Sequence, residues 1–176
     1  MCDITGIVYE ISPDGERVFP RAAVADGDGK QPKPFKSEWA AVKDGLLYVG
    51  SMGKEWTTSG GGVAHRNPQW VKTLDAHGRI RNLDWTRQYD ALRAATNTSF
   101  PGYMLHEAVL WHEQRRRWLF LPRRACSIGP YHPSSDERRG TNLLLLADEH
   151  FAHVDVRRVE LGDGDVDVEW GFTAAE

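Results

Sequence analysis

Short apolar segments separated by turn residues make up most of the chain. Residues 38–42 and 46–50 are two such segments, and the Asp44-Gly45 pair between them is typical of a β-hairpin turn. Further segments of this kind are residues 6–11, 17–24, 69–74, 108–111, 117–122, 142–147 and 153–159. The pattern therefore predicts a protein built mostly from short strands.

Residues 82–95 follow a different period. Trp85, Tyr89 and Leu92 lie at positions i, i+4 and i+7 of this segment, which is the spacing of one helix face. Many strands, a single helix and no regular strand–helix–strand alternation favour an all-β fold of the sandwich, barrel or propeller type.

Two stretches of the chain echo each other. Residues 35–54 and 103–124 both run from an aromatic residue to a glutamate, an apolar strand, a turn, a second apolar strand and a cation. Glu38 and Glu107 hold the equivalent positions, and the distance between them exceeds the roughly 40–50 residues of a usual propeller blade. The expected helix accounts for the excess, so the echo favours a propeller over a sandwich.

Composition narrows the choice of function. The chain has 176 residues, 40% of them hydrophobic and 27% charged, which is typical of neither a disordered segment nor a membrane protein. Its formal net charge of −3 gives no broad basic surface for nucleic acid. Cys2 and Cys126 are too few for a disulfide scaffold or a zinc cluster.

Glu38 and Glu107 are the first candidates for chemistry. If the two echoing stretches are blades, equivalent positions face the central channel, and two carboxylates brought together there repel unless a proton or a cation lies between them. Hard oxygen ligands favour Ca²⁺ or Mg²⁺. The alternative is that each glutamate pairs with a neighbouring lysine or arginine at a strand end.

Asp26-Gly-Asp-Gly29 resembles the opening of an EF-hand loop but is not one. Lys30 stands at the fifth position of such a loop and Ser37 at the twelfth, where calcium ligands are required. A glycine-flanked acidic loop can approach a metal-bound phosphate and position a water through Asp26 or Asp28. The sequence pattern alone favours the alternative, a solvated turn.

Cations follow the second apolar strand in both stretches. Arg123 and Arg124 end one stretch, Lys54 holds the corresponding place in the other, and Trp56 is near Lys54 in sequence. Lysine and arginine bind phosphate oxygens, and a tryptophan ring stacks on a base or ribose. A solvated charged face is the alternative interpretation.

Together these motifs resemble the calcium-activated nucleotidase (soluble apyrase) family over nearly the whole chain, from about Thr5 to Val159. The motifs that carry the resemblance are Asp26-Gly-Asp-Gly29, Phe35-Lys-Ser-Glu-Trp39, Gly53-Lys-Glu-Trp-Thr-Thr58, Asn67-Pro-Gln-Trp-Val-Lys72, Tyr89-Asp-Ala-Leu-Arg-Ala-Ala95, Pro101-Gly-Tyr-Met-Leu-His-Glu107, Arg117-Trp-Leu-Phe-Leu-Pro-Arg-Arg-Ala125 and Asp136-Glu-Arg-Arg-Gly-Thr-Asn142.

The resemblance implies a five-bladed β-propeller with Ca²⁺ in its central channel. It also implies Ca²⁺-dependent hydrolysis of nucleoside di- and triphosphates, typically UDP and GDP, with release of phosphate. The residue roles that we expect are catalytic for Asp26, Asp28 and Arg123, substrate-binding for Lys54, Trp56 and Arg124, and calcium-binding for Glu38, Glu107 and Thr173. The contacts of Lys54 and Arg124 with phosphate extend the family pattern.

The chain also departs from the family pattern. We expect residues 1–176 to form a single incomplete propeller domain of about three blades, with Gly171-Phe172-Thr173 in place of a Gly-Phe-Ser that carries a ligand. The alternatives are a non-catalytic module that binds calcium or nucleotide, and a structural propeller fragment. The resemblance suggests the endoplasmic reticulum, the Golgi or the cell exterior as location, and leaves a homodimer open.

Overall fold

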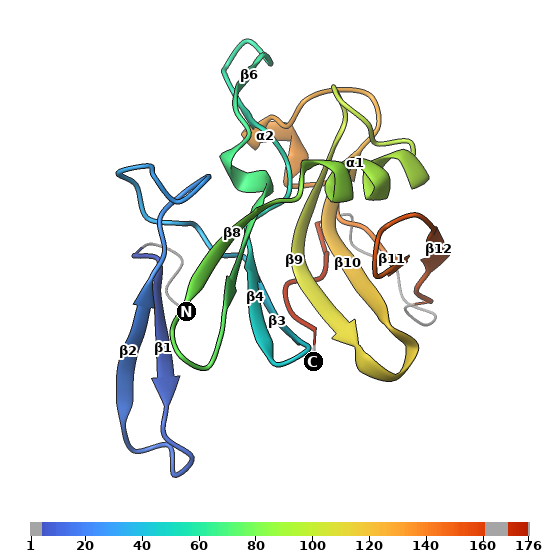
Figure 1. Ribbon diagram of the computed structural model, residues 1–176. Coiled ribbons are helices and arrows are strands. Elements are labelled where there is room, and N and C mark those ends of the chain that lie inside the picture. Colours follow the sequence, from blue (N-terminus) through green and yellow to red (C-terminus); the bar gives the residue numbers. More distant parts are fainter. Residues whose placement is uncertain (1–4, 161–168, 176) are drawn as a thin grey trace.

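Two four-stranded antiparallel sheets carry most of the computed structural model, which describes residues 5–160 and 169–175 (Figure 1). The first sheet contains, in spatial order, β3 (Trp39–Lys43), β4 (Leu46–Gly50), β7 (Trp70–Leu74) and β8 (Ile80–Asp84). The second contains β9 (Tyr103–His112), β10 (Arg117–Cys126), β11 (Leu143–Asp148) and β12 (Val154–Arg158). Each sheet keeps its strands in chain order.

Smaller elements surround these sheets. The hairpin of β1 and β2 extends away from them (Figure 1). The hairpin of β5 and β6 lies between β4 and β7 in chain order. The bounds of these elements and of the helices are β1 (Ile7–Ile11), β2 (Val18–Ala23), β5 (Trp56–Thr57), β6 (Val63–His65), α1 (Thr86–Ala95), α2 (Pro133–Asp136) and the 3-10 turns Asn67–Gln69 and Glu113–Arg115.

Strand β10 shows how the sequence pattern produces the sheets. From Arg117 to Leu121 its residues alternate between half-buried and buried positions, since successive side chains of a regular strand point to opposite faces. The predicted hairpin between β3 and β4 is confirmed as well. Asp44 and Gly45 have φ values of 50° and 74°, which a tight two-residue turn with the twist of a hairpin requires.

An aromatic core joins the two sheets and α1 into one unit. Trp85, at the start of α1, lies with its ring centroid 5.7 Å from Trp39 of the first sheet and 5.2 Å from Trp118 of the second. Tyr89 and Leu92, the other residues of the predicted helix face, are fully buried in the same cluster. Burial of this apolar face stabilises the helix more than its own propensity does.

The all-β prediction is confirmed, with corrections at the element boundaries. The predicted helix at 82–95 is wrong over residues 82–84, because these pair with β7 and complete β8. The backbone N–H of Thr86 donates to Asp84 Oδ1 (2.9 Å), and the helix begins there. Strand β9 starts at Tyr103, earlier than the predicted 108. The sequential antiparallel order suits propeller blades, and a five-bladed ring stays a prediction.

In residues 5–160 and 169–175, no helix combines the length and the apolar character needed to cross a membrane.

Candidate functional site

A pocket of about 890 Å³ is lined by residues of β5, β9 and β10 and by the segment that precedes β3. Six of the residues singled out from the sequence line it, and they are Glu38, Lys54, Trp56, Glu107, Arg123 and Arg124. Lys36, residues 57–61 and residues 130–134 form much of the remaining wall. This volume lies within the range of small-molecule sites.

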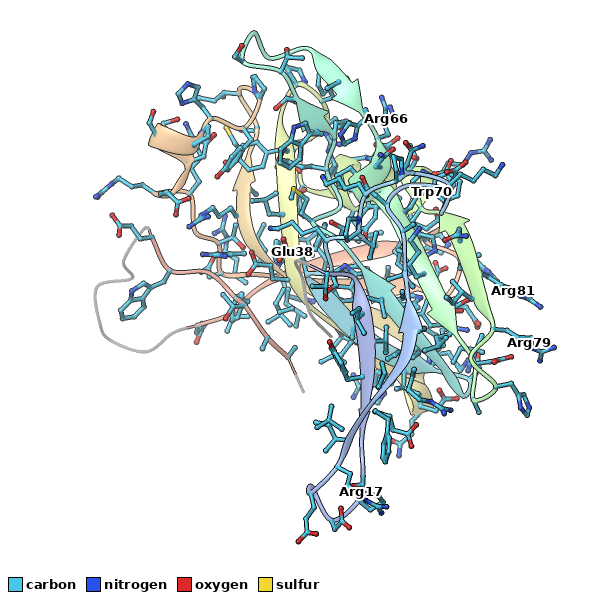
Figure 2. All side chains as sticks on the ribbon, turned by 90° about the vertical axis from the view of Figure 1, so that its left-hand side faces the viewer. Arg17, Glu38, Arg66, Trp70, Arg79 and Arg81 are labelled. Carbon is cyan, nitrogen blue, oxygen red and sulfur yellow. The ribbon has the colours of Figure 1, made fainter. Side chains whose placement is uncertain are left out.

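Two carboxylates reach the pocket from different sheets. Glu38 directly precedes β3, where its backbone N–H donates to the carbonyl of Gly50 (2.8 Å), and Figure 2 labels its side chain. Glu107 lies within β9, and β9 packs beside β3. The two side chains retain 15% and 17% of their exposure, so each carboxylate is largely shielded yet open to the pocket.

Each carboxylate has a cation as neighbour. The Lys36 ammonium donates to Glu38, and Arg123 Nη1 donates to Glu107 Oε1 at 2.7 Å. The hydrogen bond to Glu107 raises the pKa of Arg123, and the negative charges of Glu107, Glu137 and Glu38 act in the same direction. Arg123 therefore lies within electrostatic range of both pocket carboxylates.

A bulge brings two consecutive arginines to the same pocket. In a regular strand, Arg123 and Arg124 would point to opposite faces. The pairing of β10 with β9 shifts register on both sides of Pro122, which also lacks a backbone N–H for the ladder. Bulges of this kind redirect side chains next to functional sites.

Lys54 and Arg124 are two buried cations of the pocket wall. Lys54 is 5% exposed, its Nζ donates to the carbonyl of Glu55 (2.8 Å), and it lies 5.0 Å from the ring centre of Tyr131. Burial lowers the pKa of Lys54. Arg124 donates to Glu137, yet its Nε finds no acceptor in the described part of the chain. Such donors suit an anionic ligand.

A buried ion pair holds the segment that carries Lys54 and Trp56. Arg93 Nη1 of α1 donates to both carboxylate oxygens of Glu55, each at 2.9 Å, and their side chains are 1% and 3% exposed. Further bonds run from Arg93 to the carbonyls of Thr98 (3.2 Å) and Gly102 (2.7 Å). The sequence analysis missed this pair. Both residues belong to the quoted motifs, but no sequence spacing links them.

Trp56 stands at the rim with 44% of its surface exposed. His65, its cross-strand partner, stacks on it at 6.1 Å with an interplanar angle of 9°. The Lys33 ammonium lies 5.5 Å from its ring centre. Trp56 therefore presents a partly covered aromatic surface to the pocket.

Three predicted residues do not line this pocket as far as the chain is described: Asp26, Asp28 and Thr173. Asp26 is buried and accepts a hydrogen bond from Asn67 Nδ2 (3.0 Å), while Asp28 Oδ1 accepts from the backbone of Lys30 (3.0 Å). Thr173 is exposed. The roles expected for these three residues stay predictions.

The two carboxylates are ligands of the type that calcium prefers, but they supply only part of the number of ligands that calcium needs. Ca²⁺ takes six to eight oxygen ligands, and Glu38 and Glu107 supply carboxylates of the right type to one pocket. Within residues 5–160 and 169–175, no three histidines, cysteines or acidic residues group together as a metal site. A calcium ion bound at this pocket would need further oxygen ligands.

These features define a class: an antiparallel β protein whose pocket combines two carboxylates with buried and half-buried cations. Comparison with known sequences identifies the family of the chain. The chain belongs to the apyrase family, whose model matches residues 1–175. The predicted resemblance is thereby confirmed.

Individual relatives agree with this placement. The chain is 47% identical over 157 residues to soluble calcium-activated nucleotidase 1 of Rattus norvegicus, which covers 89% of this chain and 38% of that protein. It is 43% identical over 158 residues to an apyrase of Cimex lectularius, covering 90% of this chain and 43% of that protein. The chain thus spans about two fifths of the length of these curated relatives.

Proposed function

We propose that this chain forms part of a Ca²⁺-dependent hydrolase that releases phosphate from nucleoside di- and triphosphates, with UDP and GDP as typical substrates. The observation that carries the proposal is the pocket in which Glu38 and Glu107 lie beside Lys54 and Arg123. Carboxylate oxygens suit calcium, and the cations suit phosphate. The names of the relatives, a calcium-activated nucleotidase and an apyrase, agree with it.

Glu38 and Glu107 would hold the calcium ion, together with oxygens from outside this pair. When bound, Ca²⁺ supplies charge neutralisation and polarisation at the phosphoryl group under attack. Lys36 and Arg123 now neutralise the two carboxylates. These cations would turn to the substrate as the carboxylates take the metal.

The other pocket residues would bind the nucleotide. Lys54, Arg123 and Arg124 would hold the phosphate oxygens and stabilise the charge that develops during transfer. Trp56 would contact the base or the ribose. Asp26 or Asp28 would orient or deprotonate the attacking water, a role that rests on the family resemblance. Thr173 would add a calcium ligand on the same basis.

The larger architecture belongs to the same proposal. The two four-stranded sheets and the β1–β2 hairpin would be parts of a five-bladed propeller, and residues 1–176 would form one incomplete domain of it. The family resemblance suggests action in the endoplasmic reticulum, in the Golgi or outside the cell. It also leaves a homodimer open.

The isolated chain, as an incomplete domain, should show little or no turnover, so the test is phosphate release from UDP by the whole protein of which this chain is proposed to be part, with Ca²⁺ and with a chelator. Glu107→Gln keeps the size of the side chain, removes its charge and should lower Ca²⁺-dependent release by at least about tenfold. Glu16→Gln, an exposed glutamate outside the pocket, serves as the matched control and should leave release unchanged. Full activity of the Glu107→Gln variant would contradict the assignment of Glu107.

A non-catalytic role is the second candidate, because both pocket carboxylates are ion-paired as a structural role requires. Titration of the same whole protein with Ca²⁺ in a calorimeter, together with the phosphate-release assay, separates the catalytic from the non-catalytic roles. Calcium binding without phosphate release would indicate a binding module. Absence of both would indicate a structural propeller fragment.

A further inference from the structure

Residues 25–34 form a loop that carries Asp26 near its base and Asp28 further along. An isolated β-bridge between Ala25 and Pro34 closes its base. Within the loop, the backbone N–H of Asp26 donates to the carbonyl of Lys33 (2.8 Å), and that of Gly29 donates to the carbonyl of Asp26 (3.0 Å). The loop is thus a folded unit with backbone bonds of its own.

Two asparagines lie directly beneath the glycines of this loop. Gly27 and Gly29 have φ values of 56° and 87°. A Cβ atom at Gly27 would lie 2.8 Å from Asn67 Oδ1, and one at Gly29 would lie 2.5 Å from Asn82 Nδ2. The close approach of the loop to Asn67 and Asn82 therefore requires glycine at both positions.

Polar bonds fasten the loop at the same places. Asn67 Nδ2 donates to Asp26 Oδ2 at 3.0 Å. The Lys72 ammonium, on β7, donates to the carbonyl of Gly27 and to Asn82 Oδ1 (2.8 Å), its cross-strand partner on β8. Lys72 is 1% exposed, so its bond to Gly27 is shielded from water, while Asn82 itself is exposed.

The far side of the loop connects to the pocket. Lys33 places its ammonium 5.5 Å from the ring centre of Trp56, and Lys36, two residues past the bridge, donates to Glu38. Trp56, Lys36 and Glu38 all line the pocket. A displacement of the loop would therefore also displace residues of the pocket wall.

We propose that Asn67, Lys72 and Asn82 are positioning residues that anchor the acidic loop and so fix Asp26 and Asp28 relative to the pocket. This inference rests on the proposed function, because the loop carboxylates need a fixed place only if they act on a bound phosphate.

The pKa of Lys72 provides a separate way to detect the anchoring of the loop. Burial lowers the pKa of Lys72 to about 8, against the opposing effect of the negative charges of Asp26 and Asp28. Opening of the loop exposes Lys72 to water, returns its pKa toward 10.5 and takes up a proton. Opening therefore becomes rarer as the pH rises above about 8.

Amide hydrogen exchange of the unmodified chain and its variants tests the anchor without any need for turnover. In Asn67→Ala/Asn82→Ala, protection of the loop amides should fall at least tenfold while that of β3 and β4 changes less than twofold. Arg81→Ala, exposed and adjacent to Asn82, is the control and should leave the loop unchanged. Unchanged loop protection, or an equal fall throughout the sheet, would overturn the proposal. If the double variant fails to fold, Asn67→Ala alone gives the same comparison.

The dependence of loop protection on pH tests the contribution of Lys72 separately. Between pH 7 and pH 9, loop protection in the unmodified chain should rise about tenfold after correction for intrinsic exchange. Lys72→Met should remove this rise. A flat profile in the unmodified chain would overturn the role of Lys72. Absence of phosphate release by the whole protein would contradict the proposed function and leave these exchange results intact.

Discussion

His106 illustrates how completely the core next to the pocket excludes water. It directly precedes Glu107 in β9, is fully buried, and stacks on Tyr89 at a centroid distance of 5.4 Å. Neither ring nitrogen has a hydrogen-bond partner among the described residues. Burial lowers its pKa to about 3, with a smaller contribution from Arg93. The imidazole is therefore neutral at every pH at which the protein is expected to work.

His106 should make the protein sensitive to mild acid. The unfolded chain takes up a proton near pH 6.5 and the folded chain only near pH 3, so stability falls as the pH drops through this window. Between pH 7 and pH 5 the loss from this residue should be about 2 kcal/mol. Urea denaturation at the two pH values should show His106→Phe losing correspondingly less.

The control for this experiment is His77→Ala, which changes an exposed histidine. It should keep the full acid sensitivity of the unmodified chain. Equal losses in His106→Phe and in the unmodified chain would show that His106 is hydrated in solution.

At the scale of elements, a group of charged side chains ties three hairpin turns together. Arg116, in the β9–β10 turn, pairs with Asp44 of the β3–β4 turn and with Glu149 of the β11–β12 turn at 2.7 Å. Lys43 pairs with Glu149 at 2.8 Å. Hydrogen bonds from Arg116 and Lys43 lower the pKa values of Asp44 and Glu149. This group links the first sheet to the second at their turns.

Arg116→Gln should lower the melting temperature modestly, because exposed ion pairs contribute little individually. The lowered carboxylate pKa values mean that the contribution is present near neutral pH and is lost as the pH falls below the usual carboxylate range. The difference between variant and unmodified chain should therefore shrink in acid and in 1 M salt.

Arg115→Gln is the matched control for this element, since Arg115 lies in the same turn and forms no ion pair in the described structure. It should melt like the unmodified chain under all three conditions. A salt-independent difference for Arg116→Gln would point instead to lost packing against Trp111, 4.8 Å away.

The sequence predicted the regular elements well because burial on one face leaves a periodic trace. The alternation in β10 and the Asp-Gly turn after β3 are local signals. Residues 82–84 carry no such signal, since pairing with β7 decides their conformation. The two-residue strand β5 is likewise too short to show a period.

The candidate site likewise contains residues that the sequence pattern predicted and residues that it did not. Glu38, Glu107 and the arginines after the second apolar strand occupy repeated positions, and the structure brings them to one pocket. Glu55 and Arg93 were not predicted as a pair, because no regular sequence spacing marks a buried ion pair between a loop and a helix. Tyr131 comes from another distant loop, where its ring lies beside Lys54.

At the scale of the whole molecule, Trp85 is a residue that links the two sheets. Its ring contacts Trp39 and Tyr48 of the first sheet, Trp118 of the second, and Phe151 beyond β11. Aromatic rings packed edge to face add to the burial of apolar surface.

Trp85→Ala should cost about 3–5 kcal/mol of unfolding free energy and reduce the cooperativity of unfolding, because it leaves a cavity between the sheets. Circular dichroism and fluorescence followed through a urea titration should give separate transitions in this variant. Trp170→Ala, which removes a tryptophan that is 65% exposed, should unfold in one step like the unmodified chain. Coincident, unshifted transitions for Trp85→Ala would contradict the shared core.

The register shifts around Pro122 have a consequence for protein engineering. An uninterrupted ladder lets only every second residue of a strand face a given cavity, so the density of positive charge on that wall is limited by backbone geometry. Here the irregular ladder doubles that density locally, with Arg123 and Arg124 side by side at the pocket. A redesign for less highly charged ligands would begin by restoring the ladder at Pro122, leaving both arginine codons untouched.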